Sequence, residues 1–263
     1  MTNETMKKQS KEMTFALDVA RRAGDLALEY YRNRTTGTMK SDNTPVTIAD
    51  QKCERLIREA LAEHFPDDAI LGEEEGESAT SGKNKRKWII DPIDGTYNFT
   101  RQVPVWALLL ALEEDGEIVL GVLNAPAMDE LYWAEKGGGA FKNGEPTRVS
   151  AISKLDESQF EFGAPNRLVS DGYWDAMRVI CEKTYRQRGF GDYLNFGHVF
   201  EGKAEAMIEI GVKPWDIAPM KIIAEEAGGR YTDLEGGSSI YKGGCLVSNG
   251  LVHEELLKIL LSR

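Results

Sequence analysis

The chain is organised around one segment, Trp88-Ile89-Ile90-Asp91-Pro92-Ile93-Asp94-Gly95-Thr96. Its apolar start predicts a buried strand that carries Asp91 to the edge of a sheet. Pro92 has no N–H to donate and is expected to end the strand there. Asp94 follows three residues after Asp91, and Gly95-Thr96 predicts a turn into a helix. Carboxylates beside the N–H groups of a helix start can bind a cation and an anion together, so the segment predicts a phosphate held through a divalent metal ion.

The composition is that of an ordinary globular protein. Of 263 residues, 41% are hydrophobic and 9% aromatic, which suffices for one large domain or two intimate subdomains. The best candidate boundary is residues 150–158, which would give subdomains at 1–150 and 151–263 within one compact unit. The net charge of −11 argues against a nucleic-acid partner, because no basic surplus is available to neutralise phosphates.

Two features predict a cytoplasmic location. The three cysteines, Cys53, Cys181 and Cys245, have no metal-ligand spacing and are expected to be reduced thiols. Residues 1–12 lack the apolar core of a signal peptide, and the most apolar run, 103–112, is about half of the ~20 residues that a membrane span requires. We therefore expect no membrane partner.

The spacing of apolar residues predicts alternating element types. Two amphipathic helices come first, and the polar loop between them, 33–43 with Lys40, leaves open whether it closes over the site. Residues 78–87 are expected to form a loop. The alternation in the second half predicts an α/β core of layered sheets and helices. The expected helices are 13–31, 47–65, 171–183, 193–200, 217–227 and 253–261, and the expected strands are 69–71, 88–91, 105–113, 118–124, 130–134, 159–163, 185–188, 204–209 and 246–248.

Acidic residues recur where predicted strands end or helices begin. Each has an ordinary explanation when taken singly: a solvated surface cluster, a turn, or, for Asp216, a helix N-cap. Together they match the needs of a hard divalent ion such as Mg²⁺, which prefers oxygen ligands and needs few carboxylates beside a phosphate. The set comprises Asp50, Glu73, Glu74, Asp91, Asp94 and Asp216.

Three short motifs follow one another along the chain: Gly72-Glu73-Glu74, Asp91-Pro92-Ile93-Asp94-Gly95-Thr96 and Trp215-Asp216-Ile217-Ala218. In order and spacing they resemble the signature of the inositol monophosphatase family of Mg²⁺-dependent, lithium-sensitive phosphatases. Pro45-Val46-Thr47 with Asp50, and residues 225–229, extend the resemblance over nearly the whole chain. The resemblance implies an αβαβα sandwich and, as in many members, a homodimer that acts on a small phosphate ester.

The resemblance also implies a role for each residue of the site. Glu73, Asp91 and the Ile93 carbonyl would hold one Mg²⁺ ion, and Asp91, Asp94 and Asp216 a second, while Glu73 would also touch a third, weaker ion. The Gly95 and Thr96 amides would bind the phosphate. Thr96, paired with Asp50, would help to orient the attacking water. In such phosphoryl transfer, one ion lowers the pKa of that water and the other stabilises the leaving oxygen.

The identity of the ester depends on a later segment. Arg188-Gly189-Phe190-Gly191-Asp192, with Val103-Pro104-Val105-Trp106, resembles the histidinol-phosphate phosphatase branch of the family. Glu209, seven residues before Asp216, matches the position where family members contact the non-phosphate part of the substrate. The resemblance thus implies that Arg188, Asp192 and Glu209 bind substrate. Histidinol phosphate carries an ammonium and an imidazole that could bond Asp192 and Glu209, whereas a neutral inositol ring would leave buried carboxylates uncompensated.

Other interpretations stay open at this point. Asp192 could simply cap the helix that is expected near Tyr193. The protein could be an inositol monophosphatase or a broad sugar-phosphate phosphatase, while a bisphosphate nucleotidase is less favoured because no basic pocket for a second phosphate is evident. It could also be a non-catalytic, metal-dependent binding protein, although the complete set Glu73, Asp91, Asp94, Thr96 and Asp216 argues against that.

Overall fold

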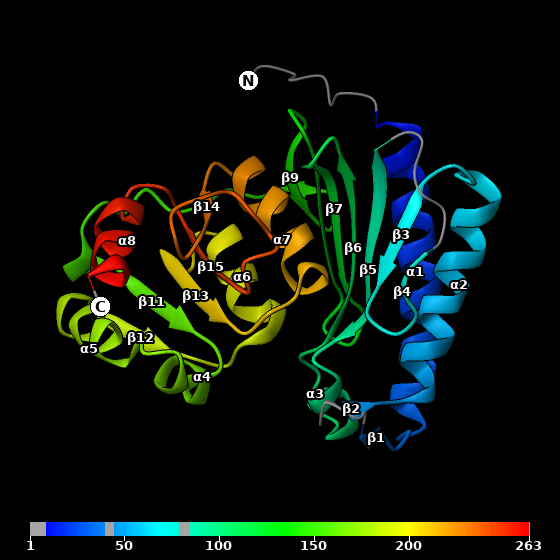
Figure 1. Cartoon of the computed structure of the whole chain (residues 1–263), viewed down its shortest axis with the longest axis horizontal. Helices are drawn as coiled ribbons and strands as arrows, with labels where there is room; N and C mark the ends of the chain where they lie inside the picture. Colours follow the sequence, from blue (N-terminus) through cyan, green and yellow to red (C-terminus); the bar gives the residue numbers. More distant parts are fainter. Residues whose placement is uncertain (1–8, 40–44, 79–84, 263) are drawn as a thin grey trace.

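The computed structural model describes residues 9–39, 45–78 and 85–262. Within them, three layers of helices alternate with the eight-stranded and the five-stranded sheet, and β1 (Thr38–Met39) and β2 (Pro45–Val46) form a separate two-stranded sheet (Figure 1). The αβαβα sandwich is therefore confirmed. The helices of the outer layer beside the larger sheet are α1 (Lys11–Arg32) and α2 (Ile48–His64), those between the sheets are α6 (Asp192–Phe200) and α7 (Pro214–Glu226), and those beyond the smaller sheet are α4 (Pro165–Ser170), α5 (Trp174–Lys183) and α8 (His253–Leu261).

The larger sheet has eight strands in the order β10-β9-β8-β7-β6-β5-β3-β4. Its neighbours are antiparallel except for the parallel pair β3 and β5. Because β3 and β5 are parallel, both strands end at the same edge of the sheet, where the candidate active site described below lies. The strands are β3 (Ala69–Gly72), β4 (Gly76–Glu77), β5 (Arg86–Asp94), β6 (Ala107–Glu114), β7 (Glu117–Ala125), β8 (Glu130–Glu135), β9 (Gly139–Lys142) and β10 (Glu145–Pro146).

The smaller sheet has five strands in the order β12-β11-β13-β15-β14. The first three are parallel, and β15 is antiparallel to both of its neighbours. The strands are β11 (Gln159–Phe162), β12 (Arg186–Arg188), β13 (Ala206–Ile210), β14 (Arg230–Asp233) and β15 (Gly244–Ser248), and the remaining elements of the chain are β1 (Thr38–Met39), β2 (Pro45–Val46), α3 (Thr96–Thr100) and the 3₁₀ helix Leu155–Glu157. The subdomain boundary expected at 150–158 stays a prediction.

Strand β6 shows how one sheet serves two cores. Leu108, Leu110 and Leu112 belong to the apolar cluster under α1 and α2, whereas the alternate residues Ala107 and Leu109 belong to the cluster shared with α6 and α7. Successive side chains of a strand point to opposite faces, so a fully apolar run is what a sheet covered on both sides requires. A third cluster lies between the smaller sheet and α4, α5 and α8.

A β-bulge at the end of β5 brings two acidic residues to one side of the sheet. Asp91 pairs with Leu109 of β6 and Asp94 pairs with Ala107, so three steps along β5 match two along β6. Residues three apart in a regular strand face opposite sides, and the extra residue corrects this. The expectation that Pro92 ends the strand is wrong, because the proline lies within the bulge, where a missing N–H is tolerated.

Helix α7 packs closely on β7 at Gly121. A Cβ atom at Gly121 would lie 2.5 Å from Ile222 Cγ2 and 2.9 Å from Pro219 Cα. The helix begins at Pro214 rather than at 217, because proline suits the first helical position. Asp216 is therefore inside the first turn, and the close approach of α7 carries its side chain toward β5.

The remaining differences from the sequence expectations are local. Strand β5 begins at Arg86, inside the expected loop 78–87, of which residues 79–84 lie outside the described part. Helix α4 and strand β14 were not expected, and the helix expected at 171–183 begins only at Trp174. Lys40 and residues 41–43 of the loop at 33–43 also lie outside the described residues, so whether this loop closes over the site stays open. No helix in the described part is long and apolar enough to cross a membrane.

We expect Gly121→Ala to lower the free energy of unfolding by about 1–3 kcal/mol, because the added methyl group overpacks the contact between β7 and α7. Since α7 carries Asp216, the variant should also bind divalent ions more weakly. Chemical denaturation with and without Mg²⁺ measures both effects. Unchanged stability and ion affinity would show that α7 does not depend on the close approach at Gly121.

Candidate active site

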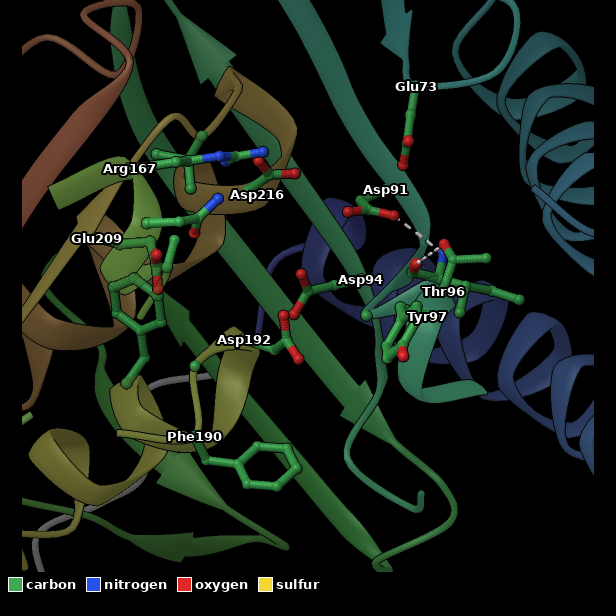
Figure 2. A pocket seen from close by; sticks show the side chains of 17 residues that line it. Glu73, Asp91, Asp94, Thr96, Tyr97, Arg167, Phe190, Asp192, Glu209 and Asp216 are labelled. Carbon is green, nitrogen blue, oxygen red and sulfur yellow. Dashed lines mark hydrogen bonds between the residues drawn. The ribbon is translucent and has the colours of Figure 1, made fainter. Parts of the chain in front are cut away.

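A cavity of about 760 Å³ lies where the ends of several elements converge (Figure 2). One wall is built by the turn after β3, the end of β5 and the start of α3. The other wall comes from the second half of the chain: the start of α4, the segment before α6, the end of β13 and the start of α7. Every sequence-predicted site residue except Asp50, Glu74 and Arg188 lines this cavity.

Three carboxylates meet at the centre of the cavity. Asp91, Asp94 and Asp216 each offer an oxygen such that these oxygens lie within 4.8 Å of one another. The Glu73 side chain points toward Asp91, and the Ile93 N–H donates to Asp91 Oδ1 over 3.0 Å, which fixes that carboxylate (Figure 2). An all-oxygen cluster with this spacing suits a hard divalent cation. The residues present therefore fit a metal site, although the role of each as a ligand stays a prediction.

Burial and mutual repulsion raise the pKa values of this cluster. Desolvation, followed by repulsion from Glu73 and Asp94, raises the pKa of Asp91 well above its usual value. The pKa of Asp94 rises in the same way through desolvation and then through the charges of Asp192 and Asp216. Desolvation raises the pKa of Asp216 to about 7. Such crowded carboxylates are unfavourable as anions unless positive charge is bound between them.

Asp50 lies behind the cavity wall and reaches it through Thr96. Thr96 Oγ1 is 3.1 Å from Asp50 Oδ1 and 3.0 Å from the Ile93 carbonyl oxygen. Asp50 Oδ2 accepts from the N–H and the hydroxyl of Thr47, in the capping box that begins α2. Burial raises the pKa of Asp50, and the bonds from Thr47 act against this rise. Asp50 is thus held rigidly as an acceptor for Thr96, while their joint role in catalysis stays a prediction.

Gly95 and Thr96 form the turn between β5 and the short helix α3. Gly95 has φ 83°, a left-handed conformation that favours glycine. A Cβ at Gly95 would lie 3.0 Å from the Val105 carbonyl oxygen and 3.4 Å from Asp192 Oδ2. The turn is therefore narrow and lies directly beside Asp192. Phosphate binding by its amides stays a prediction.

Asp192 is not a helix cap. The N-cap of α6 is Gly191, and no side chain caps this helix. The Asp192 carboxylate instead accepts a hydrogen bond from Asn98 Nδ2 of α3. Desolvation raises the pKa of Asp192 to about 6. Its carboxylate therefore faces the cavity between the two walls (Figure 2).

Glu209 is a buried carboxylate in the cavity wall, with 7% of its surface exposed. Among the described residues, its Oε2 atom has no hydrogen-bond partner. Desolvation, followed by repulsion from Asp192, raises the pKa of Glu209 to about 8. A side chain on Gly163 would overlap the carboxylate, so the glycine provides the room that Glu209 occupies. A buried carboxylate oxygen without a partner is costly and calls for a donor from a ligand.

The model of the "Inositol monophosphatase family" matches residues 8–262 of the chain. The chain belongs to this family. A "Histidinol-phosphatase" of Chlorobaculum parvum is 42% identical over 241 residues, which cover 90% of this chain and 91% of the relative. A "Fructose-1,6-bisphosphatase/inositol-1-monophosphatase" of Thermotoga maritima is 35% identical, with 94% of each chain covered. These relatives are phosphatases, and the chain is accordingly a phosphatase of this family.

The solved structures of the family share the fold. The extragenic suppressor protein suhB of Bartonella henselae superposes with a TM-score of 0.88 at 31% sequence identity, covering 95% of this chain and 98% of the other. The family is metal-dependent in general, in agreement with the cluster of Asp91, Asp94 and Asp216. The names of the two relatives above refer to different phosphate esters. Membership of the family therefore fixes the class of reaction but leaves the ester open.

The arginine that lines the cavity is not the one expected from the sequence. Arg188 does not line the cavity, because its exposed side chain donates to the Gln187 carbonyl at the edge strand β12; its role in substrate binding stays a prediction. Arg167 of α4 lines the cavity instead, with its guanidinium group directed toward Asp216 (Figure 2). Pro165, three residues after the end of β11, was the available sign of a helix start there.

We expect the metal-free protein to lose stability as the pH rises from about 5 to 8. The raised pKa of Asp216, about 7, and the raised pKa values of Asp91 and Asp94 mean that the folded state binds more protons than the unfolded state in this window. At pH 8, Mg²⁺ at a hundred times its Kd should stabilise the protein by about 2.7 kcal/mol. The same Mg²⁺ concentration should stabilise it less at pH 6, where protons compete for the carboxylates. Thermal unfolding with and without Mg²⁺ measures this difference.

Asp94→Asn is the matched variant for that experiment. It removes one charge from the cluster, so its stability should fall less with pH and gain less from Mg²⁺. Equal Mg²⁺ stabilisation at both pH values, in wild type and variant alike, would contradict a metal site at this cluster.

Proposed function

We propose that the protein hydrolyses histidinol phosphate to histidinol and inorganic phosphate, in the biosynthesis of histidine. The observation that carries the proposal is the wall built by the second half of the chain, where Asp192 and the buried Glu209 Oε2, which has no partner among the described residues, face the same cavity as the metal cluster. Two further carboxylates beside that cluster suit a substrate with positively charged or N–H donor groups. Relatives described as histidinol-phosphatases, at 38–42% identity, support the choice of ester.

The charge balance favours such a substrate over a neutral one. A hydrogen bond between a carboxylate and a cationic donor is about twice as strong as one between neutral groups. An ammonium or imidazolium group beside Glu209 would compensate the desolvation that raises the pKa of this carboxyl to about 8. A ring that carries only hydroxyl groups would donate to Glu209 but leave its charge buried without a counter-charge.

The acidic residues where the two walls of the cavity meet would hold Mg²⁺. Glu73, Asp91, the Ile93 carbonyl, Asp94 and Asp216 are the groups that would bind two or three ions there. When bound, these ions supply Lewis acidity that makes water a better nucleophile and stabilises the charge on the leaving oxygen. The Tyr193 N–H, which donates to Asp94 Oδ2 over 3.0 Å, fixes the orientation of Asp94 from the second wall.

Thr96 and Asp50 would orient the attacking water. The Thr96 hydroxyl has a single proton, and it can donate a hydrogen bond either to the Ile93 carbonyl oxygen or to Asp50 Oδ1. When it donates to Asp50, the lone pairs of Thr96 Oγ1 can accept a hydrogen bond from water. The Gly95 and Thr96 amides would bind the phosphate next to this water, so the nucleophile and the reacting group are held together.

The second candidate is an inositol-1-monophosphatase or a broad-specificity sugar-phosphate phosphatase. The 35% identity to the Thermotoga maritima protein over 94% of the chain favours it, as does the positive charge that Arg167 adds to the wall. A non-catalytic, metal-dependent binding protein is the third candidate, and the complete set of acidic residues in the cavity argues against it. The homodimer and the cytoplasmic location stay predictions.

The proposal is tested by measuring phosphate release with Mg²⁺ from histidinol phosphate and from inositol 1-phosphate, side by side. We expect kcat/KM to be higher for histidinol phosphate by about 100-fold, because charge-assisted hydrogen bonds to Glu209 and Asp192 form only with the cationic ester. Glu209→Gln should reduce this preference by about tenfold, chiefly through KM.

Glu235→Gln is the control, since it makes the same change of charge at an exposed glutamate outside the cavity. It should leave the preference unchanged. A higher kcat/KM for inositol 1-phosphate would support the second candidate over the first, and no turnover of either ester would support the third.

A further inference from the structure

Asp192 occupies a backbone conformation that residues other than glycine adopt only at a cost. Its φ is +51°, and the preceding Gly191 has φ 90° and ψ −165°, a region almost restricted to glycine. Such a conformation persists where the surrounding contacts hold it in place. The start of α6 at Gly191 and Asp192 is therefore shaped to direct the Asp192 carboxylate to one position.

The contact that holds this carboxylate comes from Asn98. The Asn98 Nδ2 atom donates to Asp192 Oδ2 and also, over 2.9 Å, to the Val105 carbonyl oxygen. The amide nitrogen carries two hydrogens, so these two acceptors use both of them. The bond to Val105 fixes the plane of the amide, and the second hydrogen then points at Asp192.

Asn98 also links Asp192 to the proposed phosphate site. It lies on α3, the five-residue helix that starts at Thr96, directly after Gly95. The Asp192 carboxylate lies beside this turn, since a Cβ at Gly95 would be 3.4 Å from Asp192 Oδ2. One short helix thus carries the amides proposed to bind phosphate and the donor that fixes the carboxylate proposed to bind the cationic part of the substrate.

We propose that Asn98 is a positioning residue that sets the distance between the bound phosphate and the Asp192 carboxylate. Through its hydrogen bond to Asp192, Asn98 favours esters whose non-phosphate part carries a positive charge within reach of that carboxylate. Esters whose non-phosphate part is neutral gain nothing from the bond. The inference rests on the proposed function and adds to it a specificity determinant that touches neither the metal cluster nor the reacting atoms. A preorganised carboxylate binds a cationic group without first losing side-chain freedom, so loss of Asn98 weakens binding more than catalysis.

A purely structural role for Asn98 makes a different prediction. Its carbonyl accepts from the Val103 N–H over 3.0 Å and its side chain bonds Val105, so it also supports the loop after α3. Damage to that loop would disturb the nearby turn at Gly95 and affect every phosphate ester equally. Dependence on substrate charge, and on the presence of Asp192, separates the two roles.

The experiment is a double-mutant cycle with Asn98→Ala, Asp192→Asn and the double variant, in the full-length protein with Mg²⁺. With histidinol phosphate, we expect Asn98→Ala to raise KM about tenfold and to change kcat by less than about threefold. With inositol 1-phosphate, we expect the same variant to change KM by less than about twofold. The double variant should be no worse than Asp192→Asn, because both changes remove the same contact. Thr100→Ala is the control on α3, since its exposed hydroxyl bonds only the Tyr97 carbonyl among the described contacts.

Asn98→Ser, which keeps one donor for the loop, replaces Asn98→Ala if the latter fails to fold, and carries the same expectations. Equal losses for both esters, or additive effects in the double variant, would contradict the positioning role while leaving the proposed function in place. If the wild-type protein releases no phosphate from histidinol phosphate but does so from inositol 1-phosphate, the proposed function fails and this inference fails with it.

Discussion

The structure depends on holding several carboxylates closer together than their charges favour. Oxygens of Asp91, Asp94 and Asp216 lie within 4.8 Å of one another in a largely buried position, which raises the pKa values of all three. Neighbouring features serve this arrangement. The bulge in β5 brings Asp91 and Asp94 to one side, and Gly121 lets α7 approach so that Asp216 completes the cluster. Repulsion between the like charges raises the free energy of the metal-free site. A divalent ion relieves this repulsion, and its affinity is higher for that reason.

The cavity has two sets of side chains, to which the proposed function gives separate tasks. The metal cluster and the turn at Gly95 would serve the reaction that members of the family share. Asp192 and Glu209, which line the same cavity, would contact the part of the ester that differs between substrates. Asn98 of α3 joins the two sets through one hydrogen bond to Asp192. Changes at Asp192 or Glu209 would therefore alter the preferred ester without disturbing the chemistry, which agrees with the different esters in the names of similar family members.

The sequence allowed the layered fold and the residues of the metal cluster to be predicted, because strand ends, helix starts and family motifs are local features. Three kinds of feature could not be predicted. The bulge at Pro92 depends on the register with β6, and a single strand does not show its partner's register. The place of Arg188 outside the cavity and of Arg167 within it depends on how α4 and β12 pack. The bond from Asn98 to Asp192 joins residues 94 apart, which no local pattern reveals.

The most direct test of the account is a crystal structure of the protein with Mg²⁺, phosphate and histidinol, the proposed products. We expect ions at Asp91, Asp94 and Asp216, and a histidinol nitrogen within hydrogen-bond distance of Glu209 Oε2, with Asp192 still bonded to Asn98. A structure with both ions and phosphate in place, but with the histidinol nitrogens directed to solvent and Glu209 without a partner, would contradict it.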